Sequence, residues 1–68
     1  MVRYKIEVDG SLAEERAVLP EDDAAARVDA IRSAADHAQH GHAVAVYRMA
    51  AGWGPPTLIY FAPAAGGS

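Results

Sequence analysis

The sequence predicts an α+β fold in which two β-hairpins flank a single helix, a ββαββ order of elements. Three observations lead to it: polar and apolar residues alternate at the N-terminus, apolar residues recur at helical spacing in the middle, and two short apolar runs flank a Gly- and Pro-rich segment near the C-terminus. A helix of about 20 residues spans ~30 Å and can return the chain across the sheet. A right-handed crossover then predicts an antiparallel four-stranded sheet of order 2-1-3-4, with the helix packed on one face.

The first hairpin begins with a strictly alternating strand over residues 2 to 9. Asp9-Gly10 supplies the positive φ angles that a tight turn requires, which predicts a returning strand through about Leu12 to Leu19. The segment from Ser11 to Glu14 also fits a helical capping box, so a short helix is the alternative there. The apolar face of the first strand comprises Val2, Tyr4, Ile6 and Val8, and its charged face comprises Arg3, Lys5, Glu7 and Asp9.

The helix is predicted to begin at Pro20, because proline suits a first turn and the acidic residues after it complement the helix dipole. Gly41 is predicted to end it as a C-cap. On the polar face, Asp23 can pair with Arg27 and Arg32 with Asp36 at i,i+4 spacing, so we expect that face to be solvated. The apolar stripe predicted to face the sheet comprises Ala24, Val28, Ile31, Ala35 and Ala38.

The second hairpin is predicted from strands over residues 42–50 and 57–62. Simple alternation sorts the side chains of each strand into two faces, and both faces are apolar. One helix covers only one face of a sheet, so we expect something else to cover the second face. The predicted faces are Val44 and Val46 against Ala43, Ala45, Tyr47 and Met49 in the first strand, and Leu58 and Tyr60 against Thr57, Ile59 and Phe61 in the second.

Length and composition predict one small domain over residues 1–62 and a disordered tail over residues 63–68. A 68-residue chain without cysteine has no disulfide to stabilise it, so we expect a homo-oligomer. The N-terminus lacks the apolar core of a signal peptide and no run approaches ~18 apolar residues, so we expect a cytoplasmic protein with no membrane partner. The net charge of −3 disfavours nucleic acid as a partner.

The sequence gives no catalytic motif, and we expect a protein that is not an enzyme and binds no cofactor. His37, His40 and His42 at the helix end are weak candidates for a metal site, because their spacing is unspecific and histidine is favoured in a last helical turn. The adjacent acid pairs point apart and do not converge on a substrate. No serine or threonine lies in a nucleophile elbow, and no glycine-rich loop precedes a helix.

The loop of the second hairpin holds the leading candidate for partner contact. Trp53 lies between two glycines and is followed by two prolines, so the loop can be preorganised at low entropic cost. Tryptophan anchors dominate many interfaces, and Tyr47 and Tyr60 extend the aromatic character of the hairpin. Glu14 and Glu15 add an acidic patch. The alternative is that the Trp53 ring folds back over the sheet and supplies core volume that the alanine-rich helix lacks.

The leading functional hypothesis is a non-enzymatic protein-binding module. Very small, acidic, cysteine-free α+β proteins are common among phage-encoded inhibitors of host or defence proteins, so by analogy of size and architecture we expect an inhibitor. The first alternative is a nucleic-acid or small-ligand domain that uses an open sheet face with Arg3, Lys5 and neighbouring Arg48. The second alternative is a structural homo-oligomer.

Overall fold

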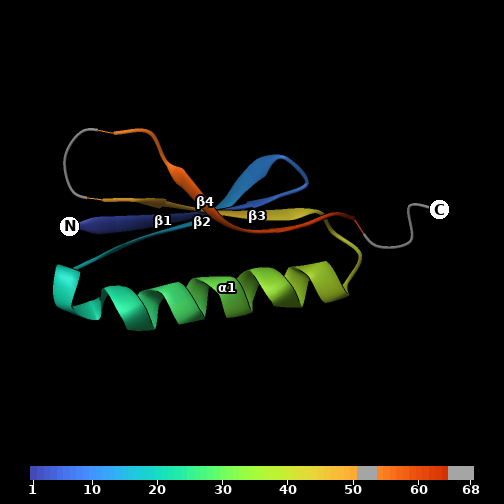
Figure 1. Cartoon of the computed structure of the whole chain (residues 1–68). Coiled ribbons are helices and arrows are strands. Elements are labelled where there is room, and N and C mark those ends of the chain that lie inside the picture. The colour runs from blue at the N-terminus through green and yellow to red at the C-terminus, as the bar shows by residue number, and fades with distance from the viewer. Residues whose placement is uncertain (51–53, 65–68) are drawn as a thin grey trace.

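The computed structural model describes residues 1–50 and 54–64 and confirms the predicted ββαββ order. The four strands form one antiparallel sheet of order β2-β1-β3-β4, and the helix packs on one face of it (Figure 1). Residues 11–18 are strand, so the short-helix alternative is wrong. The elements are β1 (Val2–Val8), β2 (Ser11–Val18), a 3₁₀ turn (Pro20–Asp22), α1 (Asp23–Gln39), β3 (Val44–Met49) and β4 (Thr57–Ala62).

The turns that bound these elements follow the local sequence signals. Asp9 and Gly10 have φ angles of 53° and 83°, the left-handed conformations expected of the hairpin turn between β1 and β2. Gly41 has φ 89° immediately after the last turn of α1, as a glycine that ends a helix does. In the part of the chain that the structure describes, no helix is long and apolar enough to cross a membrane.

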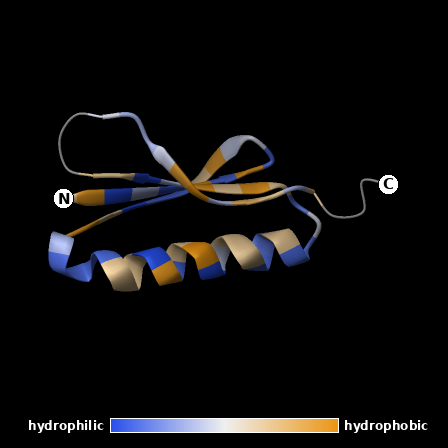
Figure 2. Cartoon of the chain, viewed as in Figure 1, coloured by the Kyte–Doolittle hydropathy of each residue, from blue (hydrophilic) through white to orange (hydrophobic). Residues whose placement is uncertain are grey.

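The core lies between α1 and the two central strands. Small alanine side chains let the helix lie close on the sheet, so the larger core side chains come from the strands. Hydrophobic and hydrophilic segments alternate along the helix (Figure 2). Among the residues that the structure describes, the buried ones are Val2, Tyr4 and Ile6 of β1, Val44 and Val46 of β3, and Ala26, Ala30 and Ala34 of α1.

The side of α1 that faces the sheet differs from the predicted stripe. The buried line is Ala26, Ala30 and Ala34, whereas Val28 is 53% exposed and Ala24 is also exposed. The prediction that Val28 and Ala24 face the sheet is therefore wrong. Alanine at the contact permits a closer approach than valine, and polar contacts from each flank of the helix, described below, hold this rotation.

The sheet contains two bulges that simple alternation did not predict. Ile6 pairs with Glu14 whereas Glu7 pairs with Leu12, so Ala13 is an extra residue in β2. Ile59 is likewise an extra residue in β4.

The bulge in β4 changes which side chains share a face. Tyr60 pairs with Val46 and Leu58 pairs with Tyr47, and paired residues lie on the same face of a sheet. Tyr60 therefore lies on the side of α1 and Leu58 on the opposite side. The prediction that Leu58 and Tyr60 share a face is wrong, because a bulge inserts one residue without a mark in the apolar pattern.

Candidate binding face

The face of the sheet directed away from α1, here called the open face, carries large apolar side chains that no described element covers. Leu58 is 50% exposed and Phe61 is 60% exposed. The register places both beside β3, with Leu58 opposite Tyr47 and Phe61 opposite Ala45. The β3–β4 half of the open face therefore forms a continuous apolar surface.

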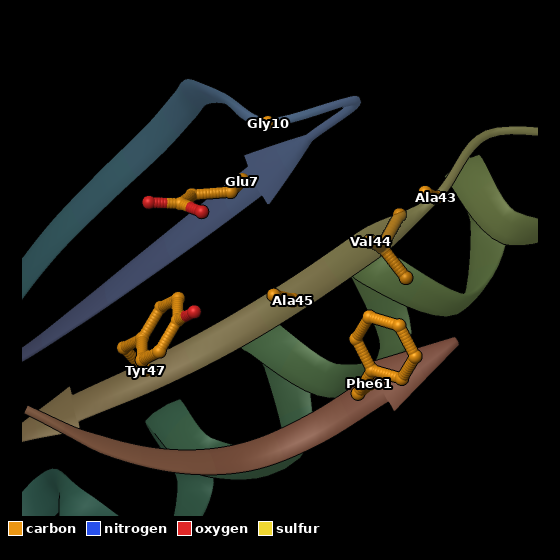
Figure 3. Close-up of a pocket in the computed structure, with 7 residues that line it drawn as sticks. All are labelled: Glu7, Gly10, Ala43, Val44, Ala45, Tyr47 and Phe61. Carbon is orange, nitrogen blue, oxygen red and sulfur yellow. The ribbon is translucent and has the colours of Figure 1, made fainter. Parts of the chain in front are cut away.

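A shallow hollow lies on this surface (Figure 3). It has a volume of about 170 Å³ and is lined by Glu7, Gly10, Ala43, Val44, Ala45, Tyr47 and Phe61. In the close-up, the rings of Tyr47 and Phe61 stand at two ends with Ala45 between them, and the carboxylate of Glu7 extends from β1 along one side. The small side chain of Ala45 leaves the floor of the hollow open.

The β1–β2 half of the open face is charged. Lys5 of β1 lies opposite Glu15 of β2 on one side and opposite Tyr47 of β3 on the other. Arg3 lies opposite Ala17 and Met49. Because opposite charges on facing strands attract, the acid of Glu15 offsets the base of Lys5, and the half carries no clustered basic patch.

The two acids predicted to form an acidic patch point to opposite faces. Glu15 lies on the open face, whereas Glu14 lies on the helix side and accepts a hydrogen bond of 2.6 Å from the Ser33 hydroxyl of α1. That bond, followed by the charge of nearby Arg16, holds the pKa of Glu14 below its ordinary value despite partial burial. Glu14 thereby ties the β2 flank of the helix to the sheet.

The aromatic candidates also separate. Tyr47 lies on the open face, whereas Tyr60 is half-buried on the helix side, where it packs against the core. Trp53 lies outside the described residues. Of the five predicted partner-binding residues, Tyr47 and Glu15 lie on the open face. They are on β3 and β2, with β1 between them.

A polar cluster fixes the start of α1 on the sheet. Arg48 of β3 donates two hydrogen bonds to the Asp23 carboxylate, 2.7 Å from Nη2 to Oδ2 and 3.2 Å from Nε to Oδ1. The buried Tyr4 of β1 donates its hydroxyl to the same carboxylate. The bonds from Arg48 and then Tyr4 lower the pKa of Asp23, whereas burial, followed by the bond to Asp23, raises the pKa of Tyr4.

This cluster was not predicted. The sequence pattern predicts Asp23 on a solvated face with Arg27, and Arg48 near Arg3 and Lys5 on the charged face. Arg48 instead lies on the helix side, opposite Tyr4, so its expected position beside Arg3 and Lys5 is wrong. The sequence does contain a signal for the position of Arg48. It follows Val44 and Val46 at every second residue, and residues at that spacing in a strand share one face, here the buried one.

Two of the histidines at the helix end contact polar groups within the chain. His42 contacts Asp9 with an Nδ1–Oδ2 distance of 2.7 Å, and Nδ1 of His40 lies 2.8 Å from the backbone oxygen of Asp36. The His37 and His42 ring centroids are 6.3 Å apart. The bond from His42 lowers the pKa of Asp9. Over residues 1–50 and 54–64, no group of three or more histidines and acids could hold a metal ion.

Comparison of the chain with protein-family models, with curated proteins and with solved structures finds no match.

In the described segments every buried side-chain nitrogen or oxygen has a hydrogen-bond partner. The polar clusters on the helix side are therefore satisfied within the chain. The apolar open face is what folding alone does not account for.

Proposed function

We propose that the chain is a small non-enzymatic protein-binding module that docks on its partner through the open face. The exposure of Leu58 and Phe61, 50% and 60%, beside Tyr47 carries the proposal. Aromatic residues are enriched in protein interfaces, and contiguous apolar patches on small proteins mark interaction sites. No residue pattern in the chain favours a chemical reaction instead.

The hollow defines the chemistry that the partner would present. A space of about 170 Å³ between two aromatic rings accepts one large side chain, and the Glu7 carboxylate at its side favours a hydrogen-bond donor or a cation. An arginine or a tyrosine that projects from the partner surface meets both conditions. The net charge of −3 further favours a basic partner by long-range attraction.

We further propose that the chain is an inhibitor of the phage-encoded type, which covers a functional surface of a cytoplasmic protein. We also propose that the chain self-associates. Nucleic-acid binding remains the alternative, but its support is reduced to Arg3 and Lys5, since Arg48 lies on the helix side. Lys5 is moreover opposite Glu15. Titration with single-stranded RNA at low salt tests this alternative through the binding isotherm.

The test is a comparison of two arginine variants that add the same charge to different surfaces. Ala45→Arg fills the hollow on the open face, whereas Val28→Arg adds its charge to the exposed outer side of α1. Immobilised wild-type chain and Val28→Arg should retain the same protein from a lysate of the source cells, and Ala45→Arg should lose it. Circular dichroism checks that both variants fold. Equal retention by all three chains would exclude the open face as the docking site.

A further inference from the structure

The two edges of the sheet differ in charge. Edge strands expose unpaired backbone groups, and natural proteins discourage pairing there with charged and inward-pointing residues. The β2 edge contains Glu14, Glu15 and Arg16, and the first and third of these point to the helix side. The β4 edge reads Thr-Leu-Ile-Tyr-Phe-Ala, without a charged residue. Within the described chain, β4 pairs only with β3, so its outer edge is open.

The bulge at Ile59 gives β4 a symmetric distribution of side chains. Leu58 and Phe61 lie on the open face through their pairing with Tyr47 and Ala45. The other residues, Thr57, Ile59, Tyr60 and Ala62, lie on the helix side through their pairing or their packing against the core. This distribution reads the same from either end of the strand.

An antiparallel strand of the same sequence therefore fits β4 face to face. With the two-fold axis between Ile59 and Tyr60, Leu58 lies opposite Phe61 of the second copy and Ile59 lies opposite its Tyr60. Thr57 lies opposite the second Ala62, so every pair places both side chains on the same side of the sheet. Strict alternation over the same six residues would have put the members of each pair on opposite faces.

We infer that a second copy of the chain pairs with β4 in this register, which joins two four-stranded sheets into one continuous sheet. The inference rests on the proposed self-association and names its surface. Pairing places Leu58 beside Phe61 of the second copy, an aromatic and aliphatic cross-strand pair on each side of the axis, so the open face continues across both copies. On the helix side it covers part of the half-buried Ile59 and Tyr60, which α1 reaches only at its margin.

The helix carries a further apolar surface on the same side. Ser33 reaches Glu14 of β2 from one flank of the buried alanine line. Ile31 projects about 160° of helical rotation away from Ser33, toward the β4 flank, and is only partly buried. Ile31 therefore borders the edge that the second copy occupies. A strand pair of this length forms a small interface, so we expect a weak, concentration-dependent dimer.

Cysteine cross-linking tests the register directly, because the natural chain has no cysteine. Paired antiparallel residues have Cα atoms about 4.5–5.5 Å apart, within disulfide range. An equal mixture of Leu58→Cys and Phe61→Cys chains should therefore form a disulfide-linked heterodimer under mild oxidation. Either variant alone should cross-link at least ~5-fold less, because like residues lie three positions, ~10 Å, apart along the strands.

A control variant on the other edge completes the experiment. Leu12→Cys is similarly exposed, at 56%, but lies on β2, and its mixture with Phe61→Cys should cross-link no more than random collision allows. Mass spectrometry identifies each product, and sedimentation of the wild-type chain up to ~500 μM measures the dimer.

The alternative outcomes are separable. Like-residue cross-linking as efficient as that of the mixture would overturn the β4 register and leave self-association standing. A wild-type chain that stays at 7.1 kDa throughout would overturn both, and would favour a strand of another protein as the occupant of the edge. Neither outcome affects the docking test with Ala45→Arg, whose readout is partner retention.

Discussion

The two faces of the sheet differ in what covers their side chains. On the helix side, the apolar residues of the two central strands are buried, and the polar groups of Tyr4, Asp23 and Arg48 bind one another. On the open face, Leu58 and Phe61 remain exposed. The contrast teaches that the first set of residues is explained by folding, whereas the second set requires a function.

The core on the helix side is small, because three of the eight buried residues in the described part of the chain are alanine. In so small a domain the core contributes only about 3–5 kcal/mol of net stability. Substitutions on the two faces of the sheet, or on the two sides of α1, should therefore differ clearly in their effect on the free energy of unfolding. Four comparisons test this.

The largest effect is expected from Ile6→Ala on the helix side. Ile6 is fully buried, and loss of such a side chain costs about 2–5 kcal/mol through lost burial and a cavity. That is comparable to the whole stability of the domain, so the variant should be largely unfolded at 25 °C by circular dichroism. Leu58→Ala is the matched change on the open face. Urea denaturation at low protein concentration should show that it lowers the free energy of unfolding by less than about 1 kcal/mol. Equal losses would mean that the monomer needs both faces.

The next effect tests the rotation of α1. Ala30 is fully buried against the sheet, so Ala30→Leu should force the helix away and destabilise the chain by about 1–3 kcal/mol. Val28→Leu adds volume on the exposed side of the same helix and should change the free energy of unfolding by less than about 0.5 kcal/mol. If urea denaturation instead shows that Val28→Leu is the more destabilising variant, the predicted apolar stripe, and not the alanine line, faces the sheet.

The outcome for this helix shows how far local sequence signals reach. The alternation of β1, the turn at Asp9-Gly10 and the helix end at Gly41 were predictable, because each depends on neighbouring residues. The helix rotation was not, because the contacts that accompany it, Glu14 with Ser33 and Asp23 with Arg48, join residues far apart in the chain.

The candidate site divides in the same way. The position of Tyr47 on the second sheet face followed from alternation in β3. The face of Leu58 did not, because the bulge at Ile59 reverses the alternation and leaves the composition of the strand unchanged. An apolar second face could therefore be predicted, but not which residues of β4 form it.

A smaller effect is expected from Tyr4→Phe, which keeps the buried ring and removes the hydroxyl that binds Asp23. A hydrogen bond to a charged group contributes about 1.5–3 kcal/mol, and Arg48 still satisfies the carboxylate, so the loss should lie near the lower end. Urea denaturation measures it. Tyr47→Phe, the same change on the open face, should leave stability within about 0.5 kcal/mol; a larger loss there would contradict the division between the faces.

The smallest effect is the pH dependence that the Asp23 cluster adds to the helix side. The folded pKa of Asp23 is lowered, chiefly by Arg48, so the folded state binds this proton less tightly than the unfolded state, whose Asp pKa is about 3.9. The stability contribution is therefore complete above about pH 5 and is lost as the pH falls through the folded pKa. In Arg48→Met, the free energy of unfolding should fall less steeply between about pH 5 and pH 2, because Asp23 then gains less from ionisation. Arg3→Met removes a positive charge from the open face instead, opposite the uncharged Ala17 and Met49, and should keep the wild-type slope. If both variants flatten the slope equally, net charge rather than the cluster sets the acid response.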